Sequence, residues 1–364
     1  MASHQNNLLL TSTVGSYAMP GWLFTAGQAM KRGEYGSHDI EETLTDATDI
    51  AINDQLKSGI DILVDGEMRR LDFVMGFYDY LQGVRLLPPR RTLGPEGHDM
   101  RPKWQVLEPI NIGSGSTIGS SAPQGLRIVA DFRYLQAATA GLGKPLKATI
   151  PGPFTLSGRL DPGTVYRDRM EVAWALVPIV NQELRDLVEA GADFIQIDEP
   201  SFAVYPDRVN DYVALWNATV QGVNAKLAMH TCFGNYRCKP VGKRLYRPLF
   251  PRLLDAKADQ IILEFANREM AELELLNEIA GTREIGAGVV DVKSYYIEKP
   301  ADVAERIRLL LKYVEPTRLQ ILPDCGFSQT ARWAAFAKMQ ALVAGTKIVR
   351  REIGGGSNSY KNFG

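Results

Sequence analysis

The chain has 364 residues, of which 45% are hydrophobic and 23% are charged, a composition typical of a globular protein with a sizeable core. Its 41 basic and 42 acidic residues give a net charge of −1, whereas nucleic-acid-binding and membrane-surface proteins normally carry a basic excess. No apolar run is long enough to cross a bilayer, and the N-terminal MASHQNNLLL lacks the regions of a secretory signal. Three cysteines do not make a disulfide framework, so we expect a reducing cytoplasm.

Eight short apolar runs predict β-strands, and longer amphipathic segments follow most of them. In chain order the runs cover residues 8–14, 61–66, 146–152, 193–199, 226–232, 260–266, 284–292 and 319–325. Helical patterns lie between several runs, and in the last two helices apolar and aromatic residues recur every three or four positions. The expected helices cover residues 170–190, 206–224, 301–314 and 331–343.

Strands that alternate with helices indicate an α/β fold with a parallel sheet, and eight such strands close into a (β/α)8 TIM barrel. An open doubly wound sheet is the alternative, but its glycine fingerprint is missing, since the glycines at 113–116 and 354–356 are typical of loops. Residues 86–124, rich in Pro, Arg, Gly and Ser, predict a long insertion after the second strand region. The sequence contains no internal repeat, so we expect one domain over residues 1–364.

Polar residues at the ends of the predicted strands carry the candidate chemistry, because strand C-termini form the active site in such barrels. These residues are Glu67, Asp198, Glu199, His230, Cys232, Glu264, Asp291, Asp324 and Cys325.

A zinc site is predicted from four of these residues. On an extended strand His230 and Cys232 point to the same side, and their nitrogen and sulfur suit Zn²⁺. Cys325 closes the eighth strand, and Glu264 is the only charge in an apolar run, where an acid is costly unless it is paired or bound to metal. Each also has a structural interpretation, as a core histidine, an inert cysteine or a salt bridge at the rim. Together they complete a four-ligand set, with Cys238 as a competing sulfur.

Motifs in a fixed order cover nearly the whole chain. The most specific are QIDEP at 196–200, His230-x-Cys232 and PDCG at 323–326. The others are TVGS at 13–16, DGEMRR at 65–70, GPFT at 152–155, Glu264 and GVVDV at 288–292. In these motifs the chain resembles the catalytic C-terminal domain of cobalamin-independent methionine synthase and its short, single-barrel relatives.

The resemblance implies a barrel that binds zinc through His230, Cys232, Glu264 and Cys325. Zinc would hold a substrate thiol as a nucleophilic thiolate at physiological pH. Glu264, the hardest ligand, would loosen when that sulfur arrives.

The resemblance also implies a homocysteine site. Ser16 and its backbone neighbours Val14 and Gly15 would hold the carboxylate, and Glu67 and Asp198 would lie at the amino group. A structural ion pair or a helix cap is the alternative for Asp198 and for the neighbouring Glu199.

The sequence departs from the folate-using members of the family on the methyl-donor side. Arg159 stands at the position of a tryptophan that stacks on the pterin, and Lys293 replaces a histidine thought to protonate the leaving nitrogen. Both residues are expected near the donor, with a solvated rim charge as the alternative. Folate-using members also carry an N-terminal barrel that this sequence does not include.

Three donors therefore stay open. The first is a methylated corrinoid such as methylcobalamin, either free or on a corrinoid protein, and the second is methyltetrahydrofolate bound in a different way. The third is an epoxide, as in relatives that alkylate coenzyme M, where Arg159 or Lys293 would steady the alkoxide.

The predicted function is a zinc-dependent methyltransferase that acts on a small thiol, in the first place homocysteine. Glu67, Asp198 and Lys293 are its expected catalytic residues, and Arg159 is expected to contact substrate. The alternatives from other classes are a non-catalytic zinc-binding carrier and a related barrel decarboxylase. A decarboxylase would have no need of the histidine and both cysteines together.

Overall fold

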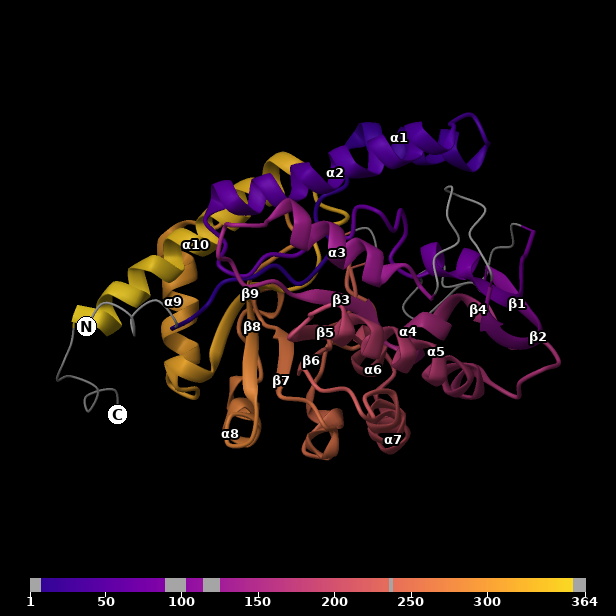
Figure 1. Ribbon diagram of the computed structural model, residues 1–364. Coiled ribbons are helices and arrows are strands. Elements are labelled where there is room, and N and C mark those ends of the chain that lie inside the picture. The colour runs from indigo at the N-terminus through magenta and orange to yellow at the C-terminus, as the bar shows by residue number, and fades with distance from the viewer. Residues whose placement is uncertain (1–7, 89–102, 114–124, 236–237, 356–364) are drawn as a thin grey trace.

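The protein is described by a computed structural model over residues 8–88, 103–113, 125–235 and 238–355. Its centre is a sheet of six parallel strands in the order β3-β5-β6-β7-β8-β9 (Figure 1). The strands are β3 (Ala148–Pro151), β5 (Phe194–Asp198), β6 (Lys226–His230), β7 (Gln260–Glu264), β8 (Glu284–Val290) and β9 (Leu319–Pro323). Nearly every residue in them is buried, which is why they are apolar runs without alternation.

The first two expected strands do not form regular strands. Residues 8–14 and 61–66 make isolated parallel bridges, in which Thr11 pairs with Ile321, Ser12 with Ile62 and Leu63 with Leu146. The side chains of Thr11 and Asp61 instead bond to each other and to each other's backbone amides, a local alternative to a continuous ladder. The mostly parallel α/β sheet is thus confirmed, but a closed barrel of eight strands is not shown.

The expected helices are present with shifted ends. The segment expected at 170–190 is α5 (Arg169–Glu189), which starts where the carboxylate of Asp168 accepts a hydrogen bond from the Glu171 amide at 3.0 Å. The segment expected at 206–224 is shorter, and the last one is longer. The helices are α1 (Gly21–Lys31), α2 (Ser37–Ser58), α3 (Ile128–Ala138), α4 (Pro153–Leu156), α5, α6 (Pro200–Val204), α7 (Val209–Thr219), α8 (Leu276–Ile279), α9 (Pro300–Leu310) and α10 (Arg332–Gly355).

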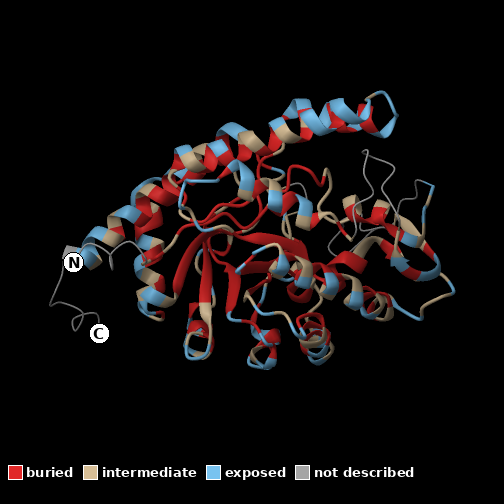
Figure 2. Ribbon diagram, in the orientation of Figure 1, coloured by how far each residue is buried: buried red, intermediate tan, exposed pale blue. Residues whose placement is uncertain are grey.

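The helices turn their apolar faces to the sheet and their polar faces to solvent (Figure 2). Helices α1, α2 and α10 lie along one side of the molecule, and α7 and α8 lie on the opposite side (Figure 1). No helix in the described part of the chain is long and apolar enough to cross a membrane.

The expected insertion belongs to a second, small sheet that the sequence did not predict. Strand β1 (Leu81–Leu86) pairs antiparallel with β2 (Trp104–Ile112), and β2 pairs parallel with β4 (Leu160–Asp161). Strand β1 precedes the expected start of the insertion at residue 86, and residues 89–102 and 114–124 of the insertion lie outside the described residues.

Candidate active site

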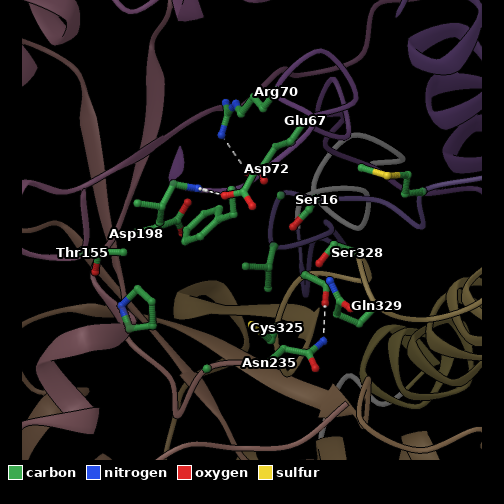
Figure 3. A pocket seen from close by; sticks show the side chains of 18 of the residues that line it. Ser16, Glu67, Arg70, Asp72, Thr155, Asp198, Asn235, Cys325, Ser328 and Gln329 are labelled. Carbon is green, nitrogen blue, oxygen red and sulfur yellow. Dashed lines mark hydrogen bonds and ion pairs between the residues drawn. The ribbon is translucent and has the colours of Figure 1, made fainter. Parts of the chain in front are cut away.

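A cleft of about 700 Å³ opens where the parallel strands end. Its walls come from the loops after β3, β5, β6, β8 and β9 and from the two segments that make isolated bridges. Figure 3 shows Glu67 and Arg70 on one side of it and Cys325 and Asn235 on the other. The predicted residues that line it are Val14, Gly15, Ser16, Glu67, Arg159, Asp198, His230 and Cys325.

A nitrogen and two sulfur atoms gather at the wall of this cleft. In the described chain the ligand atoms of His230, Cys232 and Cys325 all lie within 4.8 Å of one another, and the two Sγ atoms are 3.5 Å apart. β6 ends at His230 and β9 ends at Pro323, so both cysteines lie in the loops just beyond the strands, not on strands as expected. The Nε2 atom of His230 is buried and has no hydrogen-bond partner among the described residues. This atom and the two sulfurs are free to converge on one ion.

The two thiols share their protons unequally. The contact with the Cys232 sulfur holds the pKa of Cys325 well below its usual range, against the effect of burial. The same contact, together with burial, raises the pKa of Cys232 well above its usual range. The thiol of Cys325, which faces the cleft, therefore ionises more readily than that of Cys232.

Glu264 and Lys293 form a buried ion pair behind the cluster. Lys293 Nζ donates to Glu264 Oε2 at 2.8 Å, and the two side chains are 1% and 0% exposed. The other carboxylate oxygen, Oε1, is buried without a partner. Glu264 does not belong to the group within 4.8 Å, so its role as a fourth ligand stays a prediction. The Lys293 ammonium group contacts Glu264 and is not among the residues that line the cleft, so its expected place near the methyl donor stays a prediction.

Asp198 orients the histidine of the cluster. Its Oδ1 atom lies 2.7 Å from His230 Nδ1 and accepts a hydrogen bond from Gln196 Nε2, also at 2.7 Å. A carboxylate on Nδ1 favours the tautomer that leaves Nε2 available as a ligand. Asp198 also lines the cleft, within the set of residues expected around the substrate.

Glu199 has a different task from its neighbour. Its carboxylate accepts hydrogen bonds from the Phe154 and Thr155 amides, both at 2.9 Å, and from the Thr155 hydroxyl at 2.7 Å. These are the free amides at the start of α4, so the helix-cap interpretation holds for Glu199.

Glu67 presents an unpaired oxygen in the site. Its Oε1 accepts a hydrogen bond from Thr149 at 2.8 Å and lies 3.0 Å from Arg70 Nη1, whereas Oε2 is buried without a partner. A Cβ on Gly15 would lie 2.3 Å from Oε1, so only glycine lets the carboxylate occupy this place. Burial raises the pKa of Glu67 to about 6, although the charge of Arg70 opposes the shift.

Three other candidates support the loops. Asp324 accepts hydrogen bonds from the backbone amides of residues 265–267, which fixes the loop after β7 beside Cys325. Asp291 accepts a hydrogen bond from the Lys293 amide at 2.7 Å. The Cys238 thiol donates to the Gln329 carbonyl at 3.3 Å and takes no part in the three-residue cluster.

Comparison with known proteins shows the family. The model of the family described as "Cobalamin-independent synthase, Catalytic domain" matches residues 9–102 and 112–347. A curated relative named methionine synthase, from Saccharolobus solfataricus, is 33% identical over 349 residues, which are 95% of this chain and 96% of the relative. The chain belongs to the cobalamin-independent synthase catalytic-domain family.

Two further similarities extend over the full length. A methionine synthase from Sulfurisphaera tokodaii is 32% identical over 95% of this chain and 94% of its own. A solved structure, the B12-independent methionine synthase from Shewanella sp. W3-18-1 in complex with selenomethionine, matches with a TM-score of 0.80 and 30% identity. The match covers 96% of this chain and 99% of that one. The resemblance drawn from the motifs is thereby confirmed.

Family membership corrects one expectation about the donor. A methylcobalamin donor and a corrinoid-protein partner run against a family described as cobalamin-independent and against a relative described as B12-independent. Both are therefore withdrawn. A small-molecule thiol and a small-molecule methyl donor remain.

Two residues that line the cleft were not among the candidates predicted from the sequence. Arg70 pairs with Glu67 at a spacing of three residues, which a scan for oppositely charged neighbours would have flagged. Asn235 lines the cleft three residues after Cys232, where its Nδ2 donates to the Gly326 carbonyl at 3.1 Å and its buried Oδ1 has no partner among the described residues. Nothing in the local sequence sets Asn235 apart from other loop asparagines.

Proposed function

We propose that this protein transfers a methyl group to the thiolate of homocysteine and forms methionine, with a zinc ion held by His230, Cys232, Glu264 and Cys325. The observation that carries the proposal is the convergence of three potential ligands within 4.8 Å at the wall of a cleft that Ser16, Glu67 and Asp198 also line. A zinc-thiolate reaction needs this neighbourhood of metal ligands and of groups that bind an amino acid.

The side chains fit zinc by their chemistry. One imidazole, two cysteine sulfurs and one carboxylate are ligands that zinc takes in proteins. The buried, unpartnered atoms Nε2 of His230 and Oε1 of Glu264 would otherwise each lack a partner, which is costly in a protein interior. Asp198 on Nδ1 supplies the outer contact that ligating histidines commonly have.

The zinc ion, when bound, would supply the Lewis acidity that keeps the substrate sulfur as a thiolate at neutral pH. The chain's own residues position the substrate. We infer that Ser16 and the backbone of Val14 and Gly15 bind the carboxylate, while Glu67 Oε2 and Asp198 bind the ammonium group. The sulfur then attacks the methyl carbon, the sulfur–carbon bond forms as the bond from methyl to donor breaks, and the leaving group keeps the electron pair.

The relatives support this assignment. The Shewanella protein is described in complex with selenomethionine, the selenium analogue of the proposed product, and the archaeal relatives are named methionine synthase. We also infer that the segments around residues 11–12 and 62–63 are the first two members of a closed (β/α)8 barrel within one domain over 1–364. The parallel bridges from β9 to Leu146 support that closure.

Turnover with purified protein tests the function. We expect about one zinc ion per chain. We also expect methionine to form from homocysteine and methyltetrahydrofolate, supplied as the monoglutamate or as polyglutamates. Reactions with methylcobalamin, and with coenzyme M plus an epoxide, run in parallel. Product only in the epoxide reaction would replace the proposal with an alkyltransferase, and bound zinc without product from any donor would replace it with a carrier.

The pH dependence of homocysteine use is predicted from Glu67. Because the carboxylate must be ionised to attract the ammonium group and burial raises its pKa to about 6, kcat/KM should fall as the pH drops through about 6. In Glu67→Gln we expect kcat/KM to be about 10- to 100-fold lower at high pH, since a hydrogen bond to a charged group contributes about 1.5–3 kcal/mol. The measurement is kcat/KM against pH for both proteins. An equal ratio of the two proteins above and below the pKa would exclude this role for Glu67.

A further inference from the structure

Lys147 lies just before β3 with only 1% of its surface exposed. Its Nζ donates to two acceptors from other parts of the chain, the Thr13 carbonyl at 2.8 Å and Gln196 Oε1 at 2.6 Å. Within the described residues it forms no salt bridge, and the nearest aromatic ring, that of Phe194, is centred 5.9 Å away. Burial lowers the pKa of Lys147 to about 7, although the charges of Asp198 and Glu67 oppose the shift.

The contact between Lys147 and Gln196 begins a series of hydrogen bonds that ends at the metal-ligand cluster. Gln196 accepts from Lys147 through Oε1 and donates through Nε2 to Asp198 Oδ1, which lies 2.7 Å from His230 Nδ1. Because the Asp198 carboxylate only accepts, Gln196 must donate to it through Nε2, and this leaves Oε1 to accept from Lys147. This series of hydrogen bonds favours a proton on His230 Nδ1 and a lone pair on Nε2.

The contact between Lys147 and the Thr13 carbonyl leads to the substrate side of the cleft. The Thr13 carbonyl directly precedes Val14, Gly15 and Ser16, the segment assigned above to the substrate carboxylate. One buried ammonium group is therefore bonded both to the substrate segment and to the series of hydrogen bonds that orients His230. A shift of either would be felt by the other through a single fully buried atom.

We propose that Lys147 is a positioning residue that holds the metal-ligand histidine and the substrate segment in register, through Gln196 and Asp198 on one branch and through the Thr13 carbonyl on the other. The inference rests on the proposed zinc-dependent function. It assigns a role to Lys147 and Gln196, which are not among the residues that line the cleft.

Zinc affinity of the Lys147→Met protein, measured by chelator competition, is the first test. We expect it to be weaker than in the native protein, but by less than the roughly 10- to 100-fold cost of losing the outer partner itself, because Asp198 is kept. Lys144→Met is the matched control, because Lys144 also donates to a backbone carbonyl, that of Ile60 at 2.9 Å, but has no link to His230. Lys147→Arg should recover part of the affinity because it keeps the charge and the donors.

The second test reads the histidine directly. In NMR spectra of zinc-loaded protein labelled with ¹⁵N-histidine, the His230 Nδ1–H signal is identified by its absence from the His230→Gln protein. This signal should move upfield in Lys147→Met, because the hydrogen bond from Nδ1 weakens. Gln196→Met breaks the series at the next hydrogen bond and should give the same two changes if Lys147→Met does not fold. Unchanged affinity and an unchanged Nδ1–H signal in either variant would overturn the positioning role. Absence of zinc from the native protein would instead overturn the proposed function.

Discussion

Cys325→Ser protein is expected to lose zinc during purification and to form methionine at least about a thousandfold more slowly, since metal activation of a nucleophile contributes several kcal/mol. Cys325 is the more acidic thiol of the cysteine pair and the sulfur that faces the cleft, and a serine hydroxyl is a poor zinc ligand at neutral pH. The measurements are zinc content by elemental analysis and the rate of methionine formation with saturating homocysteine.

Cys238→Ser is the matched control for this prediction. Cys238 lies outside the cluster, and its thiol contacts only the Gln329 carbonyl among the described residues, so zinc content and rate should stay at native levels. Full zinc retention in Cys325→Ser would remove this residue from the ligand set. Zinc loss in Cys238→Ser would mean that the competing sulfur had been excluded wrongly.

Lys293→Met is expected to lower the free energy of unfolding of the metal-free protein by about 3–5 kcal/mol, because it leaves the carboxylate of Glu264 buried without its counter-ion. Glu264 is fully buried, and Lys293 is the cation that contacts it. Zinc should then stabilise the variant by more than it stabilises the native protein, since the ion would be the remaining partner of the carboxylate. Urea unfolding with and without zinc measures both quantities.

The Lys338–Glu298 pair offers a control, because it is also a buried lysine–glutamate ion pair but contains none of the proposed metal ligands. Lys338 Nζ lies 2.9 Å from Glu298 Oε2, and the side chains are 0% and 1% exposed. Arg306 Nη1 also lies 3.5 Å from Glu298 Oε1, so Lys338→Met should lose less stability than Lys293→Met but keep the native response to zinc. An identical zinc response in the two variants would show that Glu264 does not exchange Lys293 for the ion. The double variant Lys293→Met with Glu264→Gln should regain part of the loss, as both charges are then removed.

The candidate site was predictable where it depends on topology. His230, Cys232 and Cys325 are 2 to 95 positions apart, yet all follow the ends of parallel strands, and parallel strands place their carboxyl ends at one edge. The regular strands were likewise recognisable because burial on both faces makes them continuous apolar runs. The first two runs failed as regular strands because Thr11 and Asp61 bond to each other in place of part of the ladder.

The amino-acid sequence by itself determined the ligand types, their order along the chain and the family, since these reside in residue identity and spacing. Only the tertiary structure decided what each buried charge faces. In the structure Glu199 bonds to the start of α4, Asp198 to His230, Lys293 to Glu264 and Lys147 to Gln196. Each of these partners comes from a different strand or loop. The direction of a side chain across a packed core depends on those distant neighbours, so no local pattern could have assigned it.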